Sequence, residues 1–186
     1  MTYTLQQFIE DLDHITASAR QPQEIVAAAN PLLAQLVRNP HCIEPCFKRH
    51  GVTTYGRYML HRAPRFNVTS VVWGPGDTAK AHNHDTWGLV GVLENELQET
   101  RFRRRDDGSK QGFADLEMTV VNSNIAGMVS TLLPPEDDIH EMLNVTQKNT
   151  VEVHVYGKDL AHMQRLQFDV AKKSVKFFAS AKYDNC

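Results

Sequence analysis

The chain has 186 residues, which suits one domain large enough to bury its own core. Hydrophobic residues make up 41% of it and charged residues 23%, as in an ordinary globular protein. Because the formal net charge is only −2, no strongly basic surface is indicated, and we expect no nucleic-acid partner.

No apolar run is long enough to cross a bilayer, so we expect no membrane partner either. The first residues, MTYTLQQFIED, lack a basic segment followed by an apolar one, and we therefore expect no secretion signal. The cysteines Cys42, Cys46 and Cys186 are few and odd in number, which suits a reducing compartment better than a disulfide framework. We expect a cytoplasmic protein.

The first part of the chain has helical periodicity. Apolar residues recur three and four apart from Leu5 to Ile15, with Thr4 as a candidate N-cap. A second amphipathic run extends from Pro22 to Arg38, and the Asn30-Pro31 step is expected to kink or split it, because proline removes a helix hydrogen bond. We expect residues 1–48 to be a helical region that covers one end of a sheet.

From about residue 49 the pattern changes to short strands rich in β-branched and aromatic residues. The predicted strands are Val52–Leu60, Val68–Trp73, Leu89–Leu93, Leu97–Phe102, Leu116–Val121, Met128–Leu133, Val151–Tyr156 and Val175–Phe178. Turn clusters such as Gly74-Pro75-Gly76-Asp77 separate them. Many short strands at even spacing predict a mainly β, antiparallel sandwich or barrel over residues 49–186, within a single domain of residues 1–186.

His82-Asn83-His84 is the first feature with a chemical implication. In a strand, residues two apart point to the same face, so both imidazoles could bind one divalent ion. Alone the pattern is weak, because two packed or surface histidines would look the same. Downstream, Pro135-x4-His140-x3-Asn144 supplies a third histidine after a turn and before another strand, and together the two segments favour a metal site.

These two segments resemble the two metal-binding motifs of the cupin superfamily. More narrowly, HNHDTWGLVGVLENELQETRF, IHEMLN and VEVHVYG are similar to the cysteine dioxygenase type I family, which includes bacterial thiol dioxygenases acting on 3-mercaptopropionate or mercaptosuccinate; the likeness covers roughly residues 50–165. The resemblance implies a cupin, jelly-roll-like antiparallel β-barrel with N-terminal helices packed against it. It also implies Fe(II) as cofactor, with His82, His84 and His140 as metal ligands.

Gly88 is a departure from the general cupin pattern. Most cupins place a glutamate ligand there, four residues after the second histidine. Without it, three neutral imidazoles leave positions on the ion for a bidentate substrate and O2 together. Animal cysteine dioxygenases have a cysteine at this position, which forms a thioether with a tyrosine; glycine cannot, so we expect Tyr156 to be unmodified.

His154 and Tyr156 lie two apart on a predicted strand and share a face. The residues alone would also fit two buried aromatic side chains of a β core. The family carries a Ser-x-His-x-Tyr relay whose tyrosine hydroxyl points at substrate and oxygen, and the resemblance gives His154 and Tyr156 these catalytic roles. Glu152 stands in the serine position, where its carboxylate would accept a hydrogen bond from His154 and orient it.

Arg57 and Arg165 are the candidate substrate-binding residues, because a guanidinium presents parallel N–H groups to a carboxylate. The resemblance places Arg57, within Tyr55-Gly56-Arg57, at the position that cysteine-specific enzymes use. Arg165 lies nine residues after Tyr156, as in enzymes acting on 3-mercaptopropionate. Either could instead be a surface salt-bridge residue. If both point inward, the pocket would suit a thiol with two carboxylates, such as mercaptosuccinate.

The resemblance thus implies an enzyme, an Fe(II)-dependent thiol dioxygenase that adds both atoms of O2 to the sulfur of a small carboxylate-bearing thiol and gives a sulfinate. The expected partners are that thiol and O2, and the expected state is a monomer or small homo-oligomer. Two alternatives stay open: a metal-dependent cupin with isomerase or lyase chemistry, and a cupin that only binds a ligand. Neither explains the His154–Tyr156 pair beside three histidines, although those histidines alone would suit zinc as well as iron.

Overall fold

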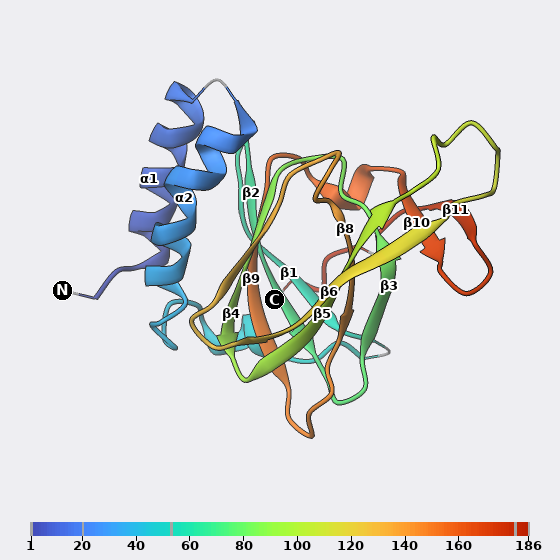
Figure 1. Cartoon of the computed structure of the whole chain (residues 1–186). Coiled ribbons are helices and arrows are strands. Elements are labelled where there is room, and N and C mark those ends of the chain that lie inside the picture. The colour runs from blue at the N-terminus through green and yellow to red at the C-terminus, as the bar shows by residue number, and fades with distance from the viewer. Residues whose placement is uncertain (1, 20, 53, 181, 186) are drawn as a thin grey trace.

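The computed structural model describes residues 2–19, 21–52, 54–180 and 182–185 (Figure 1). Cys186, one of the three cysteines used above, lies outside the described residues, while Cys42 and Cys46 are free thiols. In the part of the chain that the structure describes, two helices precede two antiparallel β-sheets. None of the described helices has the length and apolar character needed to cross a membrane.

The predicted helices are confirmed as α1 (Leu5–Ser18) and α2 (Pro22–Leu36). Thr4 caps α1: its hydroxyl accepts from the backbone N–H of Gln7, whose side chain accepts from the backbone N–H of Thr4. The expected split at Pro31 is wrong, because α2 continues through it. Burial of apolar residues on the same helix against the sheet offsets the hydrogen bond that proline removes.

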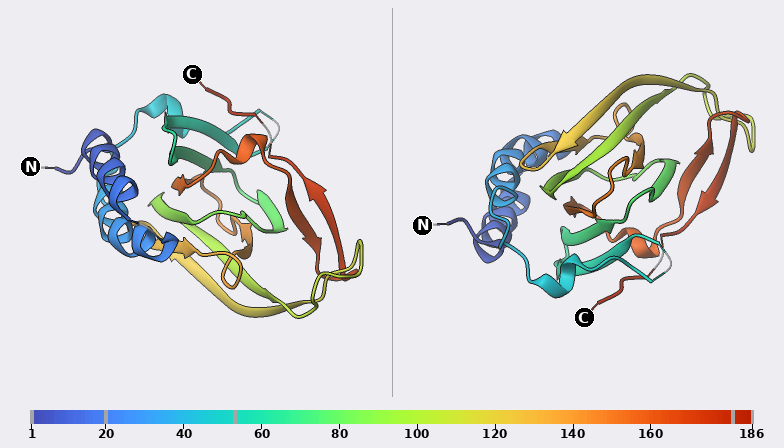
Figure 2. Two further views of the ribbon diagram at one scale, coloured as in Figure 1. Left: turned by 90° about the horizontal axis from the view of Figure 1, so that it is seen from above. Right: turned by 90° about the horizontal axis from the view of Figure 1, so that it is seen from below.

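The β-strands form two sheets that face each other (Figure 2). The first sheet has the order β1 (Gly56–Arg62), β2 (Asn67–Trp73), β9 (Thr150–Tyr156), β4 (Gly88–Glu94), β7 (Val129–Leu132). The second has the order β11 (Ser174–Phe178), β10 (Arg165–Asp169), β3 (Thr78–His82), β8 (Ile139–Leu143), β5 (Glu96–Arg104), β6 (Leu116–Ile125). Short 3₁₀ helices, η1 (Pro45–Lys48) and η2 (Leu160–His162), lie in the connections. This is the mainly β, antiparallel architecture that the strand pattern predicted, and it agrees with the jelly-roll-like cupin barrel with N-terminal helices that the resemblance implied.

Three strands were not predicted. β3, β8 and β10 are each only five residues long and mix apolar with polar or charged side chains. The predicted strand Val52–Leu60 also begins later, at Gly56, and continues to Arg62. β3 and β8 gain their stability from pairing with neighbours distant in the sequence, which a local pattern does not record, while β10 pairs mainly with the next strand, β11.

The main hydrophobic core lies between the helices and the first sheet, on the side of the molecule away from β10 and β11 (Figure 2). Strand β9 is buried along its whole length and connects this core with the barrel interior. Its Val151, Val153 and Val155 belong to the core under the helices, and the alternation of strand side chains turns Glu152, His154 and Tyr156 to the other face. The apolar face of β9 therefore anchors the polar face in place.

Candidate active site

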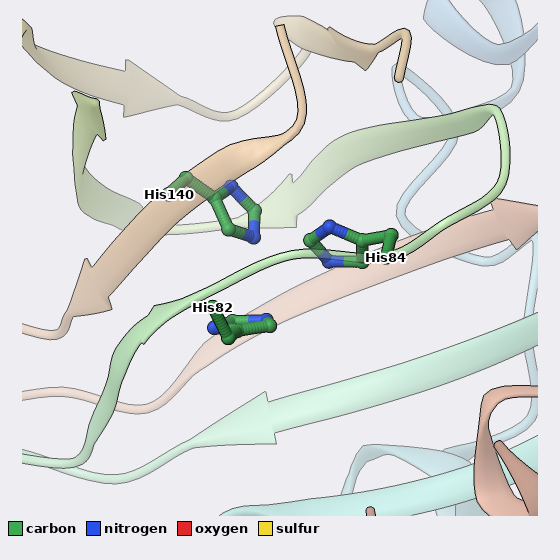
Figure 3. A group of neighbouring side chains, drawn as sticks. All are labelled: His82, His84 and His140. Atoms are coloured by element: carbon green, nitrogen blue, oxygen red, sulfur yellow. The ribbon is translucent and has the colours of Figure 1, made fainter. Parts of the chain in front are cut away.

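Three histidines converge inside the barrel (Figure 3). The ligand atoms of His82, His84 and His140 all lie within 4.8 Å of one another, and the ring centroids are 4.8 to 5.0 Å apart. His82 pairs directly with His140 across β3 and β8. The structure thus brings together the three residues that the sequence singled out as metal ligands.

The local reason for this convergence differs from the one expected. β3 ends at His82, so His84 lies in the loop beyond the strand, and His140 is the second residue of β8 rather than a residue before a strand. The carboxylate of Asp138 accepts hydrogen bonds from the backbone N–H groups of His84, at 3.0 and 3.1 Å, and of Asp85, at 3.1 Å. Asp138 therefore fixes the loop that aims His84 inward.

Each imidazole has an oxygen acceptor beside Nδ1. His82 Nδ1 lies 2.8 Å from the carbonyl of Lys80, His84 Nδ1 lies 3.1 Å from the carbonyl of Asp138, and His140 Nδ1 lies 2.8 Å from the carboxylate of Glu99. Because these oxygens can only accept, each Nδ1 carries the proton and each Nε2 keeps its lone pair. Such support is characteristic of histidines that bind metals.

The electrostatics of the site also favour metal binding. Burial, followed by the charges of His84 and His140, holds the pKa of His82 well below its usual value, and burial lowers the pKa of His84 in the same way. Neutral imidazoles bind a cation without first losing a proton. Three imidazole nitrogen donors grouped in this way fit a divalent first-row metal ion.

Glu99 and Asp138 are functional residues that sequence reasoning missed. Although burial opposes it, the hydrogen bond from His140 and the charges of His140 and Arg101 lower the pKa of Glu99, which keeps it ionised. Burial raises the pKa of Asp138 to about 6, against the backbone N–H groups that it accepts. The sequence contains one signal for Glu99: it lies two residues after Leu97 on the same strand and therefore shares the buried face of Leu97. A carboxylate on a buried face needs a hydrogen-bond or charge partner.

Glu152, His154 and Tyr156 form a hydrogen-bonded line on β9. His154 Nε2 lies 2.9 Å from Glu152 Oε2, and His154 Nδ1 lies 2.9 Å from the Tyr156 hydroxyl. The same Glu152 oxygen accepts from the indole N–H of Trp73 at 2.7 Å. Burial raises the pKa of Tyr156, so its phenol stays protonated at neutral pH. The Tyr156 ring stacks on the His84 ring with the two ring centroids 5.4 Å apart. The phenol therefore lies beside the three histidines.

Gly88 leaves the space that Tyr156 fills. Gly88 and Tyr156 are direct partners across β4 and β9, and a Cβ on Gly88 would lie 2.8 Å from two carbons of the Tyr156 ring. A glutamate ligand at this position would therefore occupy the place of the tyrosine. At Gly88 the space where the resemblance places a glutamate in most cupins is therefore taken by the Tyr156 ring.

Arg57 and Arg165 line the same cavity as the histidines, so neither is a surface salt-bridge residue. The cavity has a volume of about 330 Å³, at the small end of ligand-binding pockets. Arg57 is 9% exposed and Arg165 is 3% exposed. Arg165 Nη1 donates to the carbonyl of Asn83 at 2.8 Å, while its Nε, among the described residues, has no hydrogen-bond partner.

Comparison with known structures finds similar barrels. A protein with a double-stranded β-helix domain from Klebsiella pneumoniae subsp. pneumoniae is 15% identical, covering 73% of this chain and 92% of that one at a TM-score of 0.46. TT1209 from Thermus thermophilus is 16% identical, with coverages of 60% and 90% and a TM-score of 0.44. Oxalate oxidase in complex with glycolate is 18% identical, with coverages of 64% and 60% and a TM-score of 0.47.

Comparison with sequence families gives a more specific result. The sequence model of the family described as cysteine dioxygenase type I matches residues 44–169. The match extends over more than half of the chain and contains the three histidines, the Glu152–His154–Tyr156 line and both arginines.

Proposed function

The chain belongs to the cysteine dioxygenase type I family, and on this premise we propose that it is an Fe(II)-dependent thiol dioxygenase. In the proposed reaction both atoms of O2 are added to the sulfur of a small carboxylate-bearing thiol, which leaves as the sulfinate. The thiolate sulfur loses four electrons and O2 gains four, so the atoms and electrons balance without an external reductant.

The observation that carries this proposal is the presence of three kinds of group in one small cavity. The three histidines, the Tyr156 hydroxyl with its relay and the two arginines all line it. A cupin with isomerase or lyase chemistry needs the metal but gives no role to a buried tyrosine held by a histidine. A thiol dioxygenase gives every one of these groups a role.

The three imidazoles would hold the metal through Nε2, with Glu99 and Asp138 keeping two of the rings in place. Iron(II) bound there would lower the pKa of the substrate thiol and supply the redox chemistry that O2 requires. Iron rather than zinc is proposed because oxidation of sulfur by O2 needs a redox-active ion.

Tyr156 is the proposed hydrogen-bond donor to the reacting groups. With His154 neutral, its Nε2–H donates to Glu152 and its Nδ1 accepts from the Tyr156 hydroxyl. When His154 Nδ1 carries a proton, it donates to the Tyr156 oxygen instead, and the Tyr156 hydroxyl hydrogen can point into the cavity. Glu152, His154 and Tyr156 are thus able to pass a proton toward the substrate and take it back.

Arg165 and Arg57 are the proposed carboxylate-binding residues. Burial, assisted by the nearby positive charge of Arg57, lowers the pKa of Arg165. In the described part of the chain the buried Nε of Arg165 has no hydrogen-bond partner, so a bound carboxylate would offset the cost of burying this charge. Two guanidinium groups in one cavity favour a thiol that carries two carboxylates, as in mercaptosuccinate, over one that carries a single carboxylate.

Oxygen uptake tests the proposal. The purified protein, loaded with Fe(II), is given cysteine, 3-mercaptopropionate, cysteamine and mercaptosuccinate in parallel. We expect uptake with the carboxylate-bearing thiols, fastest with mercaptosuccinate, and little with cysteamine, which has no carboxylate. Absence of uptake with all four thiols, despite one bound metal per chain, would favour a non-oxidative cupin instead.

A further inference from the structure

Residues 179–180 follow β11 in the second sheet, while residues 182–185 lie beside β1, the edge strand of the first sheet (Figure 2). We define the closing segment as residues 179–185 without residue 181. Its first residues, Ala179 and Ser180, line the cavity. Farther on, the backbone N–H of Asp184 donates to the carbonyl of Arg57 at 2.7 Å, and the backbone N–H of Arg57 donates to the Asp184 carboxylate at 2.9 Å. The closing segment is therefore attached to β1 at the residue that enters the cavity.

Ser180 contacts the first of the two cavity arginines. Its hydroxyl accepts a hydrogen bond from Nη2 of Arg165. Phe178, the last residue of β11, lies under the same guanidinium, whose central carbon is 4.6 Å from the ring centroid. With the carbonyl of Asn83 on Nη1, three neighbours fix the plane of the Arg165 guanidinium.

Tyr183 contacts the second arginine. The central carbon of the Arg57 guanidinium lies 4.9 Å from the centroid of the Tyr183 ring. The Tyr183 hydroxyl donates to Asp159 at 2.7 Å, and Asp159 also pairs with Arg62 at 2.6 Å. The ring is thus held at its far end while its face supports Arg57.

We propose that the closing segment is part of the substrate site, in which Ser180 and Tyr183 are positioning residues that hold the Arg165 and Arg57 guanidinium groups and set the preference for carboxylate-bearing thiols. This inference rests on the proposed function for the identity of the thiol. The physical reason is preorganisation: arginine has several rotatable bonds, and a guanidinium already fixed in place loses less freedom when a carboxylate binds.

The two substitutions that test this are Ser180→Ala and Tyr183→Leu, with Phe177→Ser as the matched control. Phe177 is on β11 beside Phe178, but it is 71% exposed and does not line the cavity. We expect either test variant to raise KM for mercaptosuccinate about threefold to tenfold, with kcat changed less than twofold and the slow oxygen uptake with cysteamine unchanged. The control should match the wild type with both thiols.

A loss of activity of equal size for both thiols, or no change in either variant, would overturn the inference. A role in folding alone would produce the first of these results, because a less stable chain loses activity toward every substrate.

A binding measurement separates this inference from the proposed chemistry. Succinate carries two carboxylates but no sulfur, and its affinity for the metal-loaded protein is measured without O2 by calorimetry. Weaker binding to Ser180→Ala and Tyr183→Leu than to the wild type would support the inference even if no thiol were oxidised. Equal binding to all variants, or none to the wild type, would contradict it whatever the oxygen assay gives.

Discussion

Tyr156 is the residue on which the proposed chemistry depends most directly, because its hydroxyl lies between His154 and the cavity. Replacing Tyr156 by Phe removes the proton donor and leaves the ring that packs on Gly88 and His84. We expect kcat to fall about a hundredfold or more, as for loss of a general acid, with KM for the thiol changed little. Steady-state oxygen uptake measures both values. A change confined to KM would show that the hydroxyl only binds substrate.

Glu99 contacts the proposed metal site through its hydrogen bond with His140. The change Glu99→Gln removes the charge that fixes the Nδ1 proton of His140 and is expected to weaken metal affinity about tenfold to a hundredfold. The control is Glu117→Gln on β6, where the carboxylate forms an exposed pair with Arg105. Titration with Fe(II) without O2 gives the affinities. Equal Fe(II) affinity of the Glu99→Gln and Glu117→Gln variants would show that Glu99 does not support metal binding.

The candidate ligands and substrate-binding residues were singled out with the help of the resemblance to a family, because paired histidines, a tyrosine two residues after a histidine and two arginines would alone also fit packed or surface side chains. The acidic residues that support them depend on strand pairing. Glu99 acquires its role because β5 pairs with β8 and places it beside His140, 41 residues away in the chain. Asp138 acts through backbone groups 53 and 54 residues away, and no local pattern encodes such pairing.

At the scale of elements, β4 separates the two parts of the molecule. One face of this strand, at Gly88, packs on Tyr156, and the other, at Gly91, packs on Leu33 of α2 and on Val37 at its C-terminal end. A Cβ would come within 2.8 Å of a neighbour at either glycine. The two positions therefore allow overpacking of the active site and of the helix interface to be compared.

Gly88→Ala and Gly91→Ala should each lower the free energy of unfolding by roughly 1–3 kcal/mol, as overpacking in a core does. Only Gly88→Ala should also lower kcat, because it displaces the Tyr156 ring. Denaturant unfolding and oxygen uptake, each normalised to folded protein, distinguish these effects. Equal kcat in the two variants would mean that Tyr156 does not require its place beside Gly88.

The elements that could be predicted are those with a regular apolar pattern. The helices and strands such as β2 and β9 have long apolar faces, and the structure confirms them. β3, β8 and β10 were missed because they are short and many of their cavity-lining side chains are polar, among them His82, His140 and Arg165. The closing segment was missed because its contacts with β1 involve mainly backbone atoms and single side chains.

At the scale of the whole molecule, the main core and the metal site lie on different sides of the first sheet. Because the core does not need the metal, we expect the protein to stay folded when a chelator removes the ion. A metal present at about a hundred times its Kd adds about 2.7 kcal/mol of stability, so its removal should lower Tm by roughly 5–10 °C. Thermal unfolding followed by circular dichroism tests this, and loss of the β signal at room temperature would contradict it.

The measurement that tests the central claim most directly is the reaction of the Fe(II)-loaded protein with mercaptosuccinate under ¹⁸O2. If the chain is a thiol dioxygenase, mass spectrometry will show a sulfinate in which both oxygen atoms carry the label, formed in a one-to-one ratio with the O2 consumed. A product with one labelled oxygen and one from water, or a disulfide formed while O2 is reduced to peroxide, would contradict the account.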